Sequence, residues 1–284
     1  MDSAQPSRTA LRVALRRAAH QLYDDHPLVF EDPLAVPILG SHAAELKRTP
    51  GRLANGKPRP HSVAMRAFVV ARSRYAEDLL GQAVEHGVTQ YVLLGAGLDT
   101  FAHRNPYPAL RVFEVDHSAT QQWKRELLHQ ANLPEPQRLT YVPVDFEHQA
   151  LGAELLSAGF DPTVPTFFSW LGVVSYITLE AFRKTVRFLA EQPAGTGVVL
   201  DYEQPRAVLP RLEQLARDSR SYRARLVGED LKLFFSPAEI AAELAAFRER
   251  EDLGTADLDA RYFSGRTDRL RPIGEAPRIV SGWL

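Results

Sequence analysis

The pattern of hydrophobic and polar positions changes once along the chain, near residue 90. Before this point, apolar residues recur at helical spacing, as in "TALRVALRRAAHQL" and "SVAMRAFVVARSRYAEDLL". After it, short apolar runs bounded by turn residues alternate with amphipathic stretches. Such alternation predicts strand–helix–strand units in a parallel sheet with helices on both faces, which is an α/β fold.

Two long helices and one shorter helical piece are predicted in the first part. The long helices span residues 7–25 and 62–87, with Ser7 or Thr9 as the N-cap of the first and Gly87 closing the second. Between them, "EDPLAVPILG" predicts a helical piece that ends at its final glycine. The stretch "KRTPGRLANGKPRPH" is basic and rich in turn residues, so we expect a surface loop.

The second part predicts seven strands. Five apolar runs give the first five: "QYVLLG", "LRVFEVD", "LTYVPVD", "TFFSWLG" and "TGVVLDYE". The segments "RERED" and "RIVSGWL" complete the sheet, and helices are predicted at "SATQQWKRELLHQ", "LEAFRKTVRFLAEQ" and "SPAEIAAELAAF". We expect one domain of 284 residues, with a helical extension over 1–88, a cofactor-binding core over 89–204, a helical cap over 205–235 and the rest of the sheet over 236–284.

Composition narrows the possible functions. A net charge of -1 removes the general attraction that nucleic-acid and anionic-membrane proteins rely on, so neither partner is expected. The chain has no cysteine, which excludes disulfides, thiolate zinc sites and a cysteine nucleophile, and no metal site is expected. No run approaches the roughly 20 apolar residues of a membrane helix, and arginines interrupt the N-terminal stretch. The expected location is the cytoplasm.

A Gly-x-Gly turn follows the first predicted strand, in "LLGAGLDT". Gly95 and Gly97 allow a ligand to approach the backbone at the strand end. A dinucleotide-binding fingerprint would require a third glycine at position 100, which is Thr100 here, and no phosphate-binding Gly-Lys-Ser/Thr is present. The turn alone is equally consistent with a tight strand-to-helix connection.

Acidic residues end the next two predicted strands. Asp116 lies about 20 residues beyond the glycines, where an acid accepts hydrogen bonds from ribose hydroxyls, although Glu114 on the same strand is an alternative. Asp145 ends the third strand and could accept from an adenine amine, with the Phe146 amide donating to the ring. A solvated acid or a helix N-cap would explain each one separately. Together, the three strand ends predict a nucleoside site.

The chain resembles the S-adenosylmethionine-dependent methyltransferases related to leucine carboxyl methyltransferase. The similar segments are "EDPLA", "ARSRYAED", "LLGAGLDTFAHR", "FEVDHSATQQWKRELL", "VPVDFE" and "SWLGVVSYITLEA", with looser similarity at "GRTDRL". The resemblance implies a Rossmann-like seven-stranded methyltransferase fold, with S-adenosyl-L-methionine as the cofactor and S-adenosyl-L-homocysteine as the product.

The resemblance also implies roles for particular residues. Arg72, rather than Arg74, is implied to pair with the methionyl carboxylate. Relatives often carry a glutamate after the fourth strand, where this chain has Leu171, so the cofactor's amino group needs another acceptor, such as the Ser169 carbonyl. The remaining implied cofactor contacts are the methionine part at Gly95, Ala96 and Gly97, the ribose at Asp116, and the adenine at Asp145 and Phe146.

Methyl transfer from a sulfonium is an in-line displacement that depends on alignment and exclusion of water. A carboxylate acceptor needs no base, whereas a base accelerates transfer to a phenol or alcohol by about 10²–10⁴-fold. The candidate catalytic residues are His117, Tyr176, Tyr202 and Glu203, and the candidate substrate contacts are Tyr176, Tyr202, Arg220 and Arg223. Each of them also has a structural interpretation, as a core, helix-start or solvated residue.

The expected function is therefore O-methylation of a carboxylate or hydroxyl on a small molecule, such as a secondary metabolite. Carboxyl methylation of a protein C-terminus is one alternative. An NAD(P)-dependent oxidoreductase is another, but the third glycine and a Tyr-x-x-x-Lys pair are both missing. A methyltransferase fold that binds cofactor without turnover is the third. The sequence does not define the oligomeric state.

Overall fold

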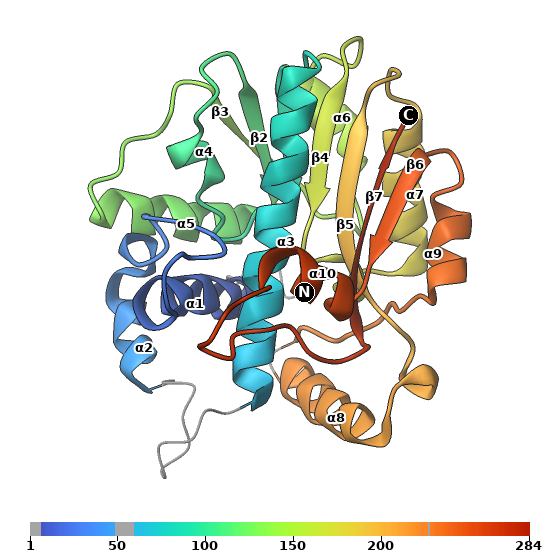
Figure 1. The fold of residues 1–284 in the computed structure, drawn as a ribbon. Helices are drawn as coiled ribbons and strands as arrows, with labels where there is room; N and C mark the ends of the chain where they lie inside the picture. The colour runs from blue at the N-terminus through green and yellow to red at the C-terminus, as the bar shows by residue number, and fades with distance from the viewer. Residues whose placement is uncertain (1–6, 49–59, 227) are drawn as a thin grey trace.

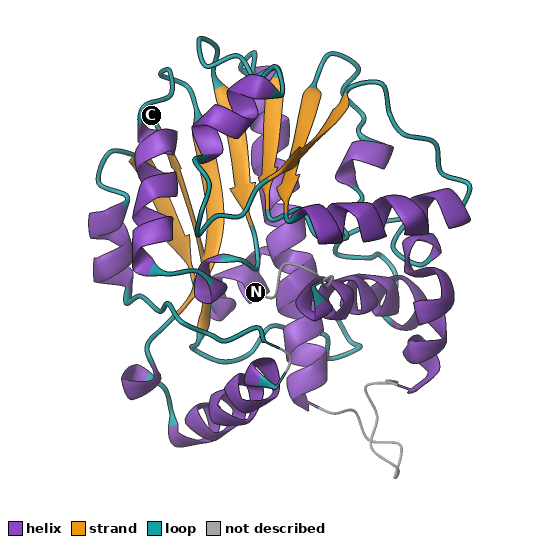
Figure 2. Ribbon diagram, turned by 180° about the vertical axis from the view of Figure 1, so that it is seen from behind, coloured by secondary structure: helices purple, strands orange, loops and turns teal. Residues whose placement is uncertain are grey.

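The computed structural model describes residues 7–48, 60–226 and 228–284. Its centre is a seven-stranded sheet with the order β3-β2-β1-β4-β5-β7-β6, which Figures 1 and 2 show from opposite sides. Each segment that the sequence predicts as a strand forms one. The strands are β1 (Gln90–Leu94), β2 (Arg111–Asp116), β3 (Leu139–Pro143), β4 (Thr166–Trp170), β5 (Gly197–Glu203), β6 (Arg248–Leu253) and β7 (Pro277–Trp283).

The sheet is mixed, so the prediction of a parallel sheet is wrong for one strand. Strands β1 to β5 run parallel, but β7 is antiparallel to both β5 and β6. Helix α10 (Thr255–Tyr262) and the loop after it return the chain to the end at which β6 finished. Strand β7 therefore enters between its neighbours in the opposite direction, and hydrophobic patterning does not encode such a reversal.

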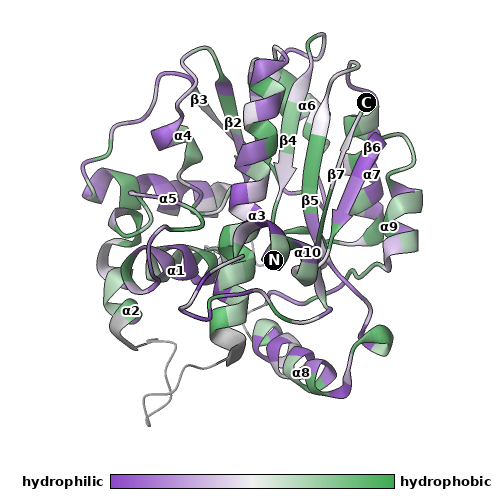
Figure 3. Cartoon of the chain, viewed as in Figure 1, coloured by the Kyte–Doolittle hydropathy of each residue, from purple (hydrophilic) through white to green (hydrophobic). Residues whose placement is uncertain are grey.

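Helices cover both faces of the sheet and bury its apolar side chains. Helices α3 (Pro60–Glu85) and α10 pack on one face. The other face is covered by α6 (Leu151–Ser157), α7 (Leu179–Ala190) and α9 (Pro237–Glu243). In Figure 3, central β5 is largely hydrophobic in colour and edge strand β6 is largely hydrophilic. Charged edge strands of this kind resist pairing with other chains.

A third buried cluster joins α1 (Arg8–Tyr23), the 3-10 helix η1 (Pro37–Ala43) and α5 (Ser118–Gln130). Ser7 is the N-cap of α1, because its Oγ accepts a hydrogen bond from Ala10 N at 3.1 Å. The remaining helices include α2 (Ala44–Arg48), α4 (Phe101–Arg104) and α8 (Arg211–Arg225). Helices α2, α4, α6 and α10 were not predicted from the sequence.

One sequence expectation for the first part agrees with the structure, and another falls outside the described residues. The segment "EDPLAVPILG" forms a turn and then the first part of η1, which begins at Pro37. Gly40 interrupts the helical conformation, with φ 51° and ψ -128°, so the predicted helical piece ends at that glycine, as a 3-10 helix. The predicted loop lies mostly at residues 49–59, outside the described residues. No helix in the described ranges is long and apolar enough to cross a membrane.

Candidate active site

The carboxyl ends of β1 to β4 meet at one edge of the sheet, where a cavity opens. This first cavity is lined by the strand ends, by α3 and by α1. All eight residues expected to contact the cofactor line it: Arg72, Gly95, Ala96, Gly97, Asp116, Asp145, Phe146 and Ser169. The sheet topology thus brings together residues from five separate segments of the chain.

Hydrogen bonds to β2 hold the glycine turn after β1. Gly95 N donates to Val115 O at 2.7 Å, and Gly97 N donates to Asp116 Oδ2 at 2.6 Å. Gly95 and Gly97 have φ values of 72° and 51°, in the left-handed region that favours glycine. A Cβ on Gly95 would lie 2.2 Å from Val173 Cγ2. The turn therefore leaves bare backbone facing the cavity, packed directly against the segment after β4.

The structure separates the two acids of β2. Asp116 lines the first cavity, and its Oδ1 accepts a hydrogen bond from His117 N at 2.7 Å. Burial raises the pKa of the Asp116 carboxyl, and its hydrogen bonds with backbone N–H groups oppose this shift. Glu114 is instead fully buried, with an oxygen 2.5 Å from Lys124 Nζ. Of the two candidates for ribose, only Asp116 reaches the cavity.

Asp145 and Phe146 follow β3 in the chain and line one end of the first cavity. Asp145 Oδ1 accepts from Glu147 N at 2.9 Å, which fixes the turn. His117 Nε2 lies 3.3 Å from Asp145 Oδ2, and the Phe146 ring centroid lies 6.1 Å from that of Trp170. His117 therefore belongs to the same end as Asp116 and Asp145.

Arg72 lies on α3 and lines the first cavity. An ion pair with Asp201 of β5 holds its side chain in place. Arg72 Nη1 lies 2.5 Å from Asp201 Oδ2, and Asp201 Oδ1 accepts from Gly172 N at 2.5 Å. Gly172 has no side chain to obstruct this contact, since a Cβ there would lie 2.9 Å from Arg72 Nη2. Arg74 is exposed and pairs with Asp78. Of the two arginines in "ARSRY", only Arg72 lies at the site.

The region after β4 contains Leu171 at the position where relatives often have a glutamate. Leu171 lines the first cavity, so an apolar side chain replaces a carboxylate there. Ser169 also lines it, and its Oγ lies 2.8 Å from the Tyr91 hydroxyl. The carboxylates of Glu77 and Asp99 line the same cavity, but both are paired with arginines.

Helix α1 closes one side of the first cavity, which the sequence did not indicate. Its start is tied to the cap segment, because Ser7 Oγ and Thr9 N donate to Glu229 Oε1 at 2.8 and 3.2 Å. Glu229 is buried. The sequence predicts the helix but contains no local signal for its partner 220 residues away. The residues of α1 that line the first cavity are Thr9, Ala10, Val13, Ala14 and Arg17.

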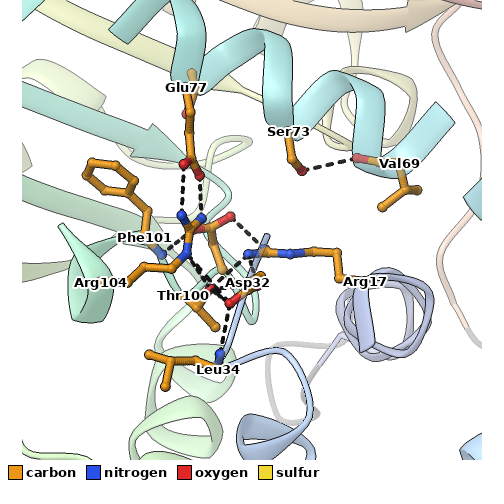
Figure 4. Close-up of polar contacts among 12 residues, drawn as sticks. Arg17, Asp32, Leu34, Val69, Ser73, Glu77, Thr100, Phe101 and Arg104 are labelled. Carbon is orange, nitrogen blue, oxygen red and sulfur yellow. Dashed lines mark hydrogen bonds and ion pairs between the residues drawn. The ribbon is translucent and has the colours of Figure 1, made fainter. Parts of the chain in front are cut away.

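A buried ion-pair network joins α1 to the glycine turn (Figure 4). Arg17 lies 2.5 Å from Asp32 Oδ2 and 2.7 Å from Asp99 Oδ2. Thr100 Oγ1 donates to Asp32 at 2.8 Å. Burial would raise the pKa of Asp99, but the guanidinium of Arg17, assisted by that of Arg104, holds it down at about 2. Thr100, at the missing third glycine, therefore uses its hydroxyl to anchor the "EDPLA" motif.

His103 in α4 gives the fold a specific pH dependence. Burial lowers the pKa of His103 from 6.5 to about 4, and both ring nitrogens lack a hydrogen-bond partner within the described chain. The unfolded chain binds this proton below about pH 6.5, whereas the fold binds it only below about pH 4. We expect the His103 contribution to lower the free energy of unfolding as the pH falls from about 6.5 to 4.

Urea unfolding of the wild type and of His103→Leu at several pH values would measure this contribution. The stability difference between the two proteins should change across that window and level off on both sides. Parallel stability curves would contradict a buried, neutral His103.

A second cavity adjoins the first beneath the cap. The two cavities share lining residues Thr9, Val13, Arg72, Gly172, Val173 and Tyr176. The second cavity is also lined by the remaining candidates for catalysis and substrate binding, which are Tyr202, Glu203, Arg220 and Arg223. His117 lines only the first cavity.

Three of these four candidates, Tyr202, Glu203 and Arg220, already make hydrogen bonds with other side chains of the protein. The Tyr202 hydroxyl donates to Asp252 Oδ2 at 2.6 Å and accepts from Arg278 Nε at 3.1 Å. Glu203 Oε2 accepts from Arg220 at 2.6 Å. Burial raises the pKa of Tyr176, opposed by a hydrogen bond with the Thr9 side chain. Of the candidates for catalysis and substrate binding, Tyr176 is the one that lines both cavities.

Comparisons with known proteins agree with this arrangement. The family model described as leucine carboxyl methyltransferase matches residues 10–190. "Putative S-adenosyl-L-methionine-dependent methyltransferase YktD" of Bacillus subtilis is 33% identical over 300 residues, covering 95% of both chains. A Frankia alni protein with the same descriptive name, FRAAL3718, is 38% identical over 201 residues, covering 68% of this chain and 67% of that one.

Two solved structures show the same fold. A DUF574 family protein from Streptomyces avermitilis aligns with a TM-score of 0.56 at 20% identity, covering 99% of this chain and 98% of the other. A methyltransferase structure from Thermobifida fusca, described as putative, aligns with a TM-score of 0.59 at 16% identity, covering 99% and 96%.

Fold and relatives together define the chain as an S-adenosyl-L-methionine-dependent methyltransferase. It belongs to the leucine carboxyl methyltransferase family. The sequence-based expectations of enzyme class, fold and cofactor are confirmed, and this class replaces the nicotinamide-dependent alternative.

Proposed function

We propose that the protein transfers a methyl group from S-adenosyl-L-methionine in the first cavity to an oxygen of a small molecule in the second. The observation that supports this most is the wall that the two cavities share, at Arg72, Gly172 and Tyr176. In-line displacement requires the donor sulfur and the acceptor oxygen to lie on opposite sides of the methyl group. Two adjoining chambers provide such an arrangement.

The residues of the first cavity fit the chemical groups of this cofactor. In the proposed roles, Asp116 accepts hydrogen bonds from the ribose hydroxyls, and Asp145 with the Phe146 amide contacts the adenine. The glycine turn takes the methionine part. A Gly-Lys-Ser/Thr phosphate cradle is absent from the sequence, and a nucleoside without phosphates does not require one.

Arg72 is the proposed partner of the methionyl carboxylate. Guanidinium has five N–H donors, and the ion pair with Asp201 leaves some of them for a second anion. Asp201 then acts as a positioning residue, holding both Arg72 and the Gly172 backbone. With Leu171 in place of a glutamate, backbone oxygen such as the Ser169 carbonyl is the proposed acceptor for the amino group.

The second cavity supports an acceptor that is already ionised. Tyr176 lies at the shared wall, but burial raises its pKa, which favours the neutral phenol over a base. Tyr202 and Glu203 are held in other contacts, by Asp252 and Arg220. A carboxylate needs no base for methylation. We therefore propose a carboxylate as the preferred acceptor, with a hydroxyl as the second candidate.

A screen with methyl-labelled cofactor tests this function. Carboxylic acids, phenols and a peptide with a free C-terminal carboxylate would be compared as acceptors. We expect transfer to at least one small carboxylic acid, giving an ester that releases labelled methanol in alkali. Transfer to the peptide alone, or an alkali-stable product alone, would contradict the proposed acceptor class. In the same preparation, S-adenosyl-L-homocysteine should raise the melting temperature and NAD should not.

A further inference from the structure

The second cavity contains more positive charge than its acids neutralise. Five arginines and two carboxylates line it. Asp201 pairs with Arg72, and Glu203 accepts from Arg220. Within the described ranges, no carboxylate pairs with the other three lining arginines, which are Arg12, Arg16 and Arg223.

Arg16 differs from the other two unpaired arginines in its burial. Arg12 and Arg223 are exposed, so water screens their charges, but Arg16 is half-buried. Its guanidinium makes one hydrogen bond to described residues, from Nη1 to Arg12 O at 3.1 Å. Burial, together with the nearby charge of Arg72, lowers the pKa of Arg16 to about 10, and the group remains cationic at neutral pH. A partly desolvated cation without an anion is costly, and a bound anion would remove that cost.

The position of Arg16 within the cavity indicates which part of a ligand it would meet. Arg16 lines the second cavity but not the first, whereas Gly172 and Tyr176 line both. In the proposed function, methyl transfer takes place at that shared wall. On α3, the side chains of Met65, Phe68 and Val69 also line the second cavity, giving it an apolar surface.

We propose that Arg16 binds an anionic group of the acceptor that is distinct from the oxygen receiving the methyl group. The acceptor is then bifunctional: an anionic anchor at Arg16, an apolar body against α3, and a nucleophilic oxygen at the wall shared with the first cavity. This inference rests on the proposed function, since it assigns the second cavity to the acceptor. Carboxylate, sulfonate or phosphate would satisfy the guanidinium, which matches planar and tetrahedral oxyanions alike.

Benzoate and benzamide are suitable probes, because they share an apolar ring and differ in charge. Each would be titrated calorimetrically into protein saturated with S-adenosyl-L-homocysteine. We expect benzoate to bind and benzamide not to bind. Arg16→Gln should weaken benzoate at least 10-fold, and Arg16→Lys should restore part of the loss. Arg125→Gln, at an exposed arginine of α5 that lines neither cavity, should change nothing.

Several results would overturn the inference: no benzoate binding, equal binding of benzamide, or unchanged benzoate affinity in Arg16→Gln. With labelled cofactor, benzoate held at Arg16 should not be methylated, while the dicarboxylate terephthalate should be. Formation of methyl benzoate would show that anchor and acceptor are the same group. Binding of S-adenosyl-L-homocysteine is measured first in every variant. If the wild type does not bind S-adenosyl-L-homocysteine, the result counts against the proposed function. If it binds S-adenosyl-L-homocysteine but not benzoate, the result counts only against the inference.

Discussion

Asp116→Asn is expected to weaken binding of S-adenosyl-L-homocysteine at least 100-fold. The carboxylate is proposed to accept from two ribose hydroxyls, and hydrogen bonds to charged groups contribute about 1.5–3 kcal/mol each. Losing about 3 kcal/mol corresponds to roughly a 100-fold change in affinity. The same carboxylate holds Gly97 N and His117 N, so the substitution also loosens the turn that faces the methionine part. Isothermal calorimetry measures the affinity directly.

Asp161→Asn is a matched control for Asp116→Asn. Asp161 also accepts a backbone hydrogen bond, from Thr163 N at 2.9 Å, but it lines neither cavity. We expect this variant to bind S-adenosyl-L-homocysteine like the wild type. If Asp116→Asn also keeps the wild-type affinity, the assignment of Asp116 to the ribose is wrong.

Asp32→Ala is expected to destabilise the protein by about 3–5 kcal/mol, the usual cost of removing one partner from a buried ion pair. The Asp32 side chain has no exposed surface and lies 2.5 Å from Arg17. It also accepts from Thr100 Oγ1 and Leu34 N. Its loss leaves Asp99 as the one carboxylate paired with Arg17 among the described residues and removes the link from the "EDPLA" segment to α1 and Thr100. Urea denaturation measures the free energy of unfolding.

Glu135→Ala provides the comparison for an exposed pair. Glu135 lies 2.6 Å from Arg125, and about half of each side chain is exposed. Exposed pairs contribute about 0–1 kcal/mol, so this variant should lose no more than that. Similar losses in Asp32→Ala and Glu135→Ala would contradict a structural role for the network of Figure 4.

Sequence patterning was sufficient for the strand positions and for the residues at the strand ends. Apolar runs recur with each strand, and parallel strands place Gly95, Asp116 and Asp145 at one edge without further information. The direction of β7 could not be predicted, because the loop after α10 sets it and apolar spacing does not.

Long-range polar contacts were the other feature that patterning did not reveal. Thr100 looked like a missing glycine, and its hydrogen bond to Asp32 depends on packing of segments 68 residues apart. Likewise, Arg16 was one of several arginines on a predicted helix. Its half-buried, unpaired state arises only when α1 packs against α3 and the cap. Interactions of this kind depend on tertiary structure and leave no local period.

A crystal structure with S-adenosyl-L-homocysteine would show directly whether the carboxyl ends of β1 to β4 form the cofactor site. We expect the ribose at Asp116, the adenine beside Asp145 and Phe146, and the carboxylate at Arg72, with the sulfur facing the wall shared by the two cavities. S-adenosyl-L-homocysteine bound elsewhere, or with its nucleoside at Arg72 and its carboxylate at Asp145, would contradict this expectation.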